Sequence, residues 1–187
     1  KLCLSSAFEK YIMSKRAKGF SENTISAYMQ TFSQFQKYLG ADVCVDDVDS
    51  ETIIRFLASC THVSKKTKLN HHTGLSSLWA FMENNQIVPQ NIVRKVERHI
   101  AESRQINSFT QHDIRALLNV AENSQNPVRN KAKILILLDT GIRASELCQI
   151  KIRDIDFENR RILIFGKGNK ERSVPFSKIS QKVIETY

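Results

Sequence analysis

The sequence predicts a mainly α-helical protein, with a helical domain over residues 1–98 and a mixed α and β domain over residues 109–187. Apolar side chains recur at helical spacing through most of the chain, and Ser, Thr or Asp residues stand where helices should begin. In the second half, two short apolar segments flank a glycine-rich turn, which favours a small antiparallel β-hairpin. Residues 99–108 are polar and lack periodicity, as is typical of a linker.

Four or five helices are predicted in the N-terminal domain, and the starts of four can be placed. The first covers residues 5–17, and the second follows Ser21, a candidate N-cap. The third begins at Asp49 or Ser50, and the fourth follows Ser64, which repeats the Ser-x-x-Thr pattern. Most of their apolar residues are predicted to form the core, and these are Phe8, Tyr11, Ile12, Ile25, Tyr28, Phe32, Phe35, Leu39, Ile53, Ile54, Phe56, Leu57, Leu75, Leu78, Trp79 and Met82.

Helices also begin and end the C-terminal domain. Thr110 opens the first with a pattern that resembles a capping box, and Ser177 precedes the last. The apolar run Ile134–Leu138 is predicted to be a buried helix that stops at Gly141, because glycine accepts the left-handed conformation of a helix end. Residues 123–130, which contain a proline, are predicted to be a loop.

Two basic residues of this domain stand where they can reach a phosphate. Arg143 precedes a predicted helix over residues 144–150, and a guanidinium beside the free N–H groups of a helix start suits an anion. Residues 161–165 and 171–176 are predicted strands, and the Gly-Lys-Gly turn between them has Lys167 at its tip. Arg143 can neutralise a non-bridging phosphate oxygen, and Lys167 can protonate a leaving oxygen.

The composition favours a polyanionic partner such as DNA. The formal net charge is +9, although a merely soluble basic protein would have the same charge. The four cysteines form no Cys-x-x-Cys pair, which argues against a zinc site and a disulfide framework. No apolar run approaches the roughly 20 residues of a membrane span, and no signal-peptide core is present at the start. We therefore expect a soluble cytoplasmic protein without a metal or a membrane partner.

A polar and basic surface at the start of the fourth helix is a candidate for DNA contacts. Lysines, hydroxyls and amides near helix starts bind phosphates and reach base edges. A solvated helix face with ordinary capping is the alternative. The residues expected to contact DNA in this helix are Lys65, Lys66, Thr67, His71 and His72. In the hairpin, Lys170 and Arg172 are expected to bind the DNA backbone.

Three motifs in the C-terminal domain resemble those of the tyrosine recombinase, or phage integrase, family, with Xer-like detail. They are Thr-Gly-x-Arg-x-Ser-Glu-Leu at 140–147, Asp-Ile-Asp at 154–156 and Gly-Lys-Gly-Asn-Lys-Glu-Arg-x-Val-Pro at 166–175. Their order and spacing make the match specific, whereas Gly-Lys-Gly alone would mean little. The Ser-x-x-Thr-x-x-x-Tyr pattern of Ser21, Thr24 and Tyr28 also resembles the family's DNA-binding domain and adds these residues to the expected DNA contacts. The resemblance implies a helical SAM-like core-binding domain followed by the first part of an α+β catalytic domain.

The resemblance also implies a role for each residue of the expected site. Arg143 corresponds to the first catalytic arginine and Lys167 to the proton donor for the 5′ leaving oxygen, while Glu146 supports the site without taking part in the chemistry. The alternatives are an ordinary surface ion pair between Arg143 and Glu146, and a turn lysine without a catalytic role at position 167. Lys170 lies in the same turn and competes for the role of proton donor.

The sequence departs from the family pattern beyond the hairpin. No His-x-x-Arg motif follows Lys167, and no histidine occurs after His112. Tyr187 follows Arg143 too closely to be the nucleophile and lacks the expected context. We therefore expect no nucleophile in these 187 residues, and a fragment that binds DNA without cleaving it.

The function implied by the resemblance is site-specific DNA recombination. The intact enzyme is expected to cleave DNA through a 3′-phosphotyrosyl intermediate without a cofactor. Its expected partners are double-stranded DNA and further copies of itself, or a paired recombinase, in a tetrameric synapse. The alternatives are a non-catalytic DNA-binding regulator of the same fold and an α-helical protein-interaction adaptor. A steep loss of DNA affinity with salt would separate DNA binding from the adaptor.

Overall fold

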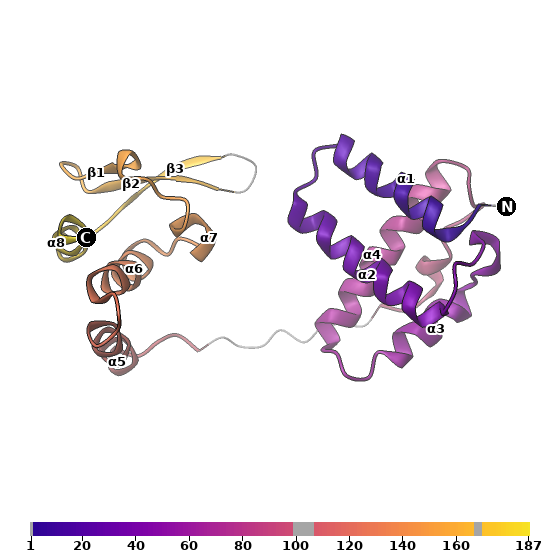
Figure 1. Ribbon diagram of the computed structural model, residues 1–187, viewed down its shortest axis with the longest axis horizontal. Coiled ribbons are helices and arrows are strands. Elements are labelled where there is room, and N and C mark those ends of the chain that lie inside the picture. Colours follow the sequence, from indigo (N-terminus) through magenta and orange to yellow (C-terminus); the bar gives the residue numbers. More distant parts are fainter. Residues whose placement is uncertain (1, 99–106, 167–169) are drawn as a thin grey trace. The chain divides into compact units, whose positions relative to one another are not determined.

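The computed structural model describes residues 2–98, 107–166 and 170–187 (Figure 1). The chain divides into two compact units, Lys1–Arg104 and Gln105–Tyr187, which we call the N-terminal and the C-terminal unit. Most of the predicted linker, residues 99–108, lies outside the described residues. The prediction of a mainly helical fold with a small antiparallel sheet is confirmed.

The described part of the N-terminal unit consists of α-helices and short 3₁₀ helices. They are α1 (Leu4–Ala17), α2 (Glu22–Leu39), η1 (Val45–Asp47), α3 (Ser50–Ser59), α4 (Lys65–Asn84) and η2 (Ile92–Lys95). Ser21, Asp49 and Ser64 are the N-caps of α2, α3 and α4, as predicted. Each side chain accepts the backbone N–H three residues further on, at 3.3, 2.8 and 3.1 Å respectively.

Helix α4 supplies much of the N-terminal core. Its residues Leu75, Leu78, Trp79 and Met82 are buried, as their spacing predicts. The ring of Phe35, on α2, meets the ring of Trp79 edge-on with centroids 6.2 Å apart, a favourable aromatic geometry. The polar face of α4 is therefore turned away from this core.

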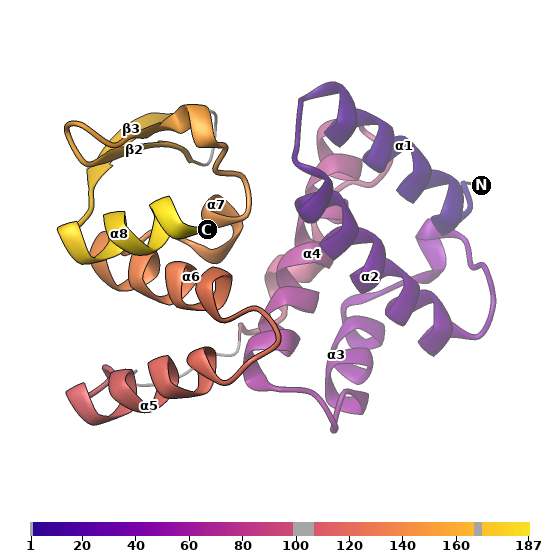
Figure 2. The same cartoon turned by 60° about the vertical axis from the view of Figure 1, so that its left-hand side comes forward.

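The C-terminal unit combines helices with a three-stranded sheet. Its described elements are α5 (Gln111–Glu122), α6 (Pro127–Thr140), α7 (Ala144–Leu147), η3 (Ile152–Asp154), β1 (Ile155–Asp156), β2 (Arg161–Phe165), β3 (Glu171–Pro175) and α8 (Lys178–Thr186). The strand order is β1-β2-β3, and both pairs are antiparallel. Figure 2 shows α6 between α5 and α8, with the sheet on the side of α8 away from α5. The two longer strands are the predicted hairpin.

A small core holds the C-terminal unit together. It includes Ile136 of α6, Ile142 of the following loop and Ile162 and Ile164 of β2. Asp139 ties α6 to the start of α8, because its Oδ2 accepts the backbone N–H of Ser177 at 2.8 Å. This hydrogen bond fixes the end of α6, just before the loop that leads into α7.

Three predictions for this unit are wrong. Pro127 lies in the first turn of α6 and not in a loop, because the first turn of a helix needs no N–H donor from that position. The run Ile134–Leu138 is only partly buried, with Leu138 43% exposed. The helix expected over residues 144–150 is a single turn that ends at Leu147.

No helix in the described ranges has both the length and the apolar character that crossing a bilayer requires.

Candidate active site

The loop between α6 and α7 presents Arg143 on the surface of the C-terminal unit. Gly141 ends α6 with φ at 61°, in the left-handed region that glycine adopts without strain, and its N–H donates to the Leu137 carbonyl at 3.0 Å. Ile142 is buried and anchors the loop in the core. Arg143 follows as the N-cap of α7, with its side chain 72% exposed.

A buried carboxylate holds Arg143 in place. The side chain of Glu146 is only 5% exposed. Its Oε2 accepts the backbone N–H of Arg143 at 2.8 Å, and its Oε1 accepts Nη1 of the same residue at 3.0 Å. The carboxylate also accepts two hydrogen bonds from Arg172, from Nη1 at 3.0 Å and from Nη2 at 2.7 Å. Charge-assisted hydrogen bonds therefore tie both the backbone and the guanidinium of Arg143 to strand β3.

These contacts keep Glu146 ionised. The hydrogen bonds from Arg172, together with those from Arg143, lower the pKa of the Glu146 carboxyl from 4.5 to about 2, although burial acts in the opposite direction. Two guanidinium groups share one carboxylate, so the cluster has a net positive charge. Arg143 is its most exposed member, and an anion arriving from solvent would meet Arg143 first.

Arg172, a predicted contact of the DNA backbone, contacts Glu146 in this structure and keeps 41% of its side chain exposed. Arg172 is opposite Ile164 in the sheet register, so its side chain shares the face of the sheet that buries Ile164. From that face the guanidinium reaches Glu146. The alternation within β3 could have indicated this position, because Arg172 and the apolar Val174 lie on one face.

The hairpin turn begins beside the same charged cluster. The N–H of Gly166 donates to the Lys170 carbonyl at 2.8 Å. A Cβ at position 166 would lie 3.2 Å from Nη1 of Arg172 and 3.6 Å from Oε1 of Glu146, so glycine permits this close approach. Lys167, the predicted proton donor, lies outside the described residues. Lys170, a predicted DNA contact, is exposed.

Some of the predicted DNA contacts of the N-terminal unit lie at the start of α4. Lys65 and Lys66 are exposed there. Thr67 is partly buried, and its Oγ1 lies 2.9 Å from Oγ of the N-cap Ser64. The two hydroxyls thus support the helix start and stay near the surface.

The other predicted contacts lie at the start of α2. Ser21 and Thr24 form the same hydroxyl pair as at α4, with 2.9 Å between their oxygens. Tyr28 is partly buried, and its ring packs edge-on against Tyr11 with centroids 5.3 Å apart. The ammonium of Lys15 lies 5.7 Å from the Tyr28 ring centroid and adds positive charge at this helix start.

The prediction that His71 and His72 lie on the same surface is wrong. Their exposed fractions are 6% and 4%. His71 Nδ1 is 3.2 Å from Oγ1 of Thr31, and His72 Nε2 is 3.0 Å from the Val96 carbonyl. The helical spacing explains the burial, because His71 stands four residues before Leu75 on the apolar face of α4. Burial lowers the pKa of the His71 imidazole.

Comparison with known proteins shows which family the chain resembles. Residues 107–187 match the phage integrase family. The tyrosine recombinase XerC of Pediococcus pentosaceus is 30% identical over 193 aligned positions, which cover 98% of this chain and 63% of the relative. The C-terminal unit therefore matches the phage integrase family, and the whole chain is similar to tyrosine recombinases. XerD of Oceanobacillus iheyensis, another tyrosine recombinase, is 27% identical over 91% of this chain and 59% of its own length. The chain thus spans about three fifths of the curated relatives it matches.

Solved structures of integrases share the fold of this chain. A lambda integrase dimer bound to a COC′ core site gives a TM-score of 0.82 at 16% identity, over 99% of this chain and 54% of that chain. The Tn1549 transposon integrase in complex with circular intermediate DNA gives a TM-score of 0.71 at 18% identity. This match covers 96% of this chain and 64% of that chain. At these identities the likeness establishes the fold only.

Proposed function

We propose that this chain is the DNA-binding and first catalytic part of a site-specific DNA recombinase. The observation that supports this most is the exposed guanidinium of Arg143, which buried Glu146 holds in place together with Arg172. A buried carboxylate is unfavourable unless it is paired, and here it orients two groups that bind phosphate in a bidentate manner. The match of residues 107–187 to the phage integrase family and the similarity to tyrosine recombinases support the same function.

The proposed reaction of the intact enzyme forms a 3′-phosphotyrosyl bond and releases a 5′-hydroxyl. Arg143 stabilises the negative charge that develops on the non-bridging oxygens. Lys167 gives its proton to the 5′ oxygen as that oxygen leaves. We expect the tyrosine nucleophile among residues that this chain does not contain, so that the chain alone binds DNA without cleaving it.

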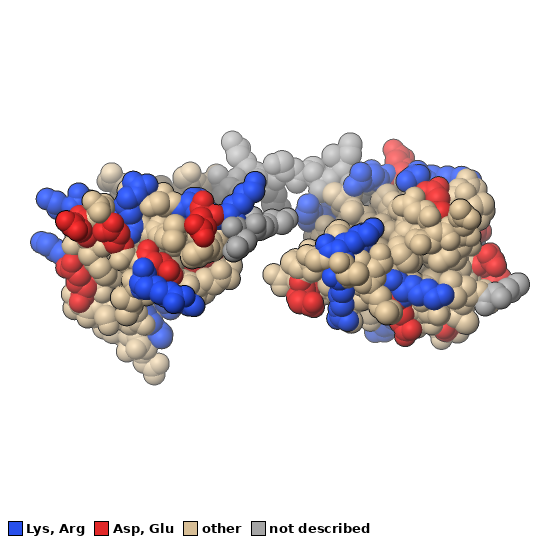
Figure 3. All heavy atoms as spheres, turned by 90° about the horizontal axis from the view of Figure 1, so that it is seen from above, with Lys and Arg blue, Asp and Glu red and all other residues tan. Residues whose placement is uncertain are grey.

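We propose that the two units bind duplex DNA through the exposed side chains at helix starts and in the hairpin. Residues 1–98 would form the core-binding domain, and residues 109–187 the first part of the catalytic domain. The N-terminal contacts are Ser21, Thr24, Tyr28, Lys65, Lys66 and Thr67, and Lys170 and Arg172 are the contacts in the hairpin. The net charge of +9 supports a polyanionic partner, and Figure 3 shows Lys and Arg side chains on the surface of both units.

The proposed assembly contains several recombinase copies on DNA. A lambda integrase tetramer bound to a Holliday junction has the same fold as this chain, with a TM-score of 0.82. By analogy, we propose a tetrameric synapse for the intact protein, made of identical copies or of paired recombinases. The curated relatives named above are bacterial, and a recombinase that acts on bacterial DNA would work in the cytoplasm.

The variant R143A tests the catalytic part of the proposal. The assay is covalent cleavage of a duplex, selected for binding from a random pool, by a polypeptide that extends to the family's tyrosine. We expect cleavage to fall about 100-fold or more, as for the loss of a preorganised charge-stabilising donor. Arg153 provides the matched control, because it is an arginine of the same unit with a 77% exposed side chain. R153A should cleave normally.

Salt dependence tests the DNA-binding part with the 187-residue chain itself. We expect the affinity for duplex DNA to fall steeply as salt rises, because cations are displaced from the backbone. DNA binding without any cleavage by the polypeptide that extends to the family's tyrosine would favour a non-catalytic regulator, and cleavage that R143A leaves unchanged would contradict the role of Arg143. The absence of binding at low salt would favour the helical adaptor.

A further inference from the structure

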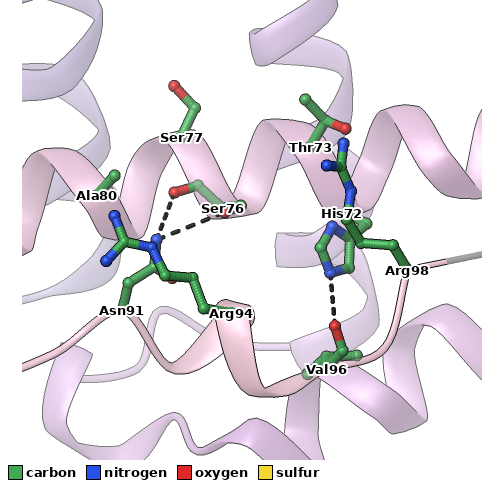
Figure 4. Close-up of a pocket in the computed structure, with 9 residues that line it drawn as sticks. All are labelled: His72, Thr73, Ser76, Ser77, Ala80, Asn91, Arg94, Val96 and Arg98. Atoms are coloured by element: carbon green, nitrogen blue, oxygen red, sulfur yellow. Dashed lines mark hydrogen bonds between the residues drawn. The ribbon is translucent and has the colours of Figure 1, made fainter.

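A cavity of about 480 Å³ lies in the N-terminal unit, between α4 and the segment that contains η2 (Figure 4). One wall is a polar face of α4, and the other is formed by residues between Asn91 and Arg98. All of its lining residues belong to this unit, and none of them is a residue of the Arg143 site. The inference below rests on this cavity and does not depend on the proposed function.

The cavity wall opposite α4 is positively charged. Arg94 lines this wall. Only its Nη1 forms an ion pair, with Oε2 of Glu83 at 3.1 Å. Arg98 forms no ion pair with the described part of the chain. No Asp or Glu is among the described residues that line the cavity. This balance of charge favours an anionic ligand and disfavours a metal cation.

The α4 wall offers hydroxyl protons to a ligand. Oγ of Ser77 accepts the hydroxyl of Tyr11 at 2.9 Å, and Oγ of Ser76 accepts Nδ2 of Asn91 at 3.5 Å. Within the described residues, neither serine hydroxyl donates to an acceptor. Each serine therefore has one proton available for a ligand oxygen.

His72 provides the observation that points most directly to a ligand. It lines the cavity with an exposed fraction of 4%, and its Nε2 donates to the Val96 carbonyl, since a carbonyl can only accept. Its Nδ1 is shielded from water and has no partner in the described ranges. Figure 4 shows Nδ1 on the ring edge turned away from Val96, toward Thr73 and Arg98. A buried polar atom without a partner is rare in native proteins and calls for an explanation.

We propose that this cavity binds a phosphate group. Its tetrahedral oxygens would accept hydrogen bonds from Arg94 and Arg98 on one wall and from Ser76 and Ser77 on the other. Nδ1 of His72 is a further donor only when both ring nitrogens carry a proton. A carboxylate presents only two oxygens in one plane and fits donors on two walls less well. The group is either a phosphate of the DNA backbone or the phosphate of a small molecule.

Inorganic phosphate provides the first test. In the ¹⁵N-labelled chain, phosphate added at constant ionic strength against chloride should shift the backbone amides of Thr73, Ser76 and Ser77 saturably. The double variant R94Q/R98Q should weaken this binding about tenfold or more, because charge-assisted hydrogen bonds are lost. S76A removes one hydroxyl with little change in packing and should weaken binding in the same direction.

Arg55 provides a matched control. It is an exposed arginine of the same unit, 3.0 Å from Oε1 of its partner Glu51. R55Q should leave phosphate binding unchanged. A thermal melt followed by circular dichroism checks that each variant is folded. The absence of saturable shifts in the unmodified chain, or equal weakening by R55Q, would overturn the proposal.

Duplex DNA then distinguishes the two sources of phosphate. If Arg94 and Arg98 bind backbone phosphates, R94Q/R98Q should reduce the slope of log affinity against log salt by about 1 to 2. An unchanged slope with intact binding of inorganic phosphate would identify a small-molecule phosphate as the ligand. If the chain binds no DNA, the proposed function fails, and the phosphate titration still decides whether this site exists.

Discussion

Glu146 links two segments of the C-terminal unit that are far apart in sequence. Its carboxylate bonds the loop residue Arg143 and, 26 residues further on, Arg172 of β3. Because the side chain is buried, it depends on both arginines to remain charged, and each arginine depends on it for orientation. The position of the exposed guanidinium is therefore a property of all three residues.

The variant E146Q should remove a pH-dependent part of the stability. The folded-state pKa of Glu146 is about 2, against 4.5 as its ordinary value. Its contribution is therefore complete above about pH 4.5 and is lost as the pH falls through 2. Urea unfolding should show E146Q less stable than the unmodified chain at pH 7, with a gap that narrows between pH 4.5 and pH 2.

Glu158 provides the control for this experiment, because it is an exposed glutamate of the same unit. E158Q should unfold like the unmodified chain at each pH. A gap between E146Q and the unmodified chain that stays constant down to pH 2 would show that ionisation of Glu146 does not stabilise the fold.

At the scale of elements, the helix starts could be predicted because the capping groups are local. Ser21, Asp49, Ser64 and Thr110 each bond a backbone N–H only three residues away. A pattern within four residues is therefore sufficient evidence for the start of a helix. The start at Pro127 was missed because the same residue is favourable both in loops and in the first turn of a helix.

The partners of polar side chains depend on contacts across the fold, and these could not be predicted. His71 contacts Thr31, which is 40 residues away, and Arg172 contacts Glu146. The motif around Arg143 identified it and Glu146 as candidates, but no local pattern shows that a strand residue would share the carboxylate. The sequence thus indicated which residues form the site, but it did not indicate the hydrogen bonds that hold their side chains in place.

The end of α6 provides a prediction at this scale. Gly141 has φ at 61°, and no heavy atom outside its chain neighbours lies within 4 Å of an added Cβ. G141A should therefore act through the backbone alone and destabilise the C-terminal unit by about 1–2 kcal/mol, the cost of a left-handed non-glycine residue. Urea unfolding measures this, and S145A, on the exposed surface of α7, should change stability by less than about 0.5 kcal/mol. Equal effects of both variants would contradict the role assigned to Gly141.

At the scale of the whole molecule, each unit has its own core. The N-terminal core contains the only tryptophan of the chain, Trp79, and the C-terminal core is the smaller cluster around Ile162. A core confined to one unit stabilises that unit directly. It stabilises the other unit only if the two units unfold in a single transition. Tryptophan fluorescence therefore reports on the N-terminal unit, while circular dichroism reports on both.

The variant I162A should separate the two unfolding transitions. Ile162 is fully buried, and its truncation should cost about 2–5 kcal/mol, from lost burial and the cavity left behind. Circular dichroism should show part of the helix signal melting at a lower temperature, while the fluorescence of Trp79 melts as in the unmodified chain. R161A, at the exposed neighbouring position of β2, should affect neither signal strongly. A parallel fall of the fluorescence transition in I162A would mean that the two units unfold as one, in spite of their separate cores.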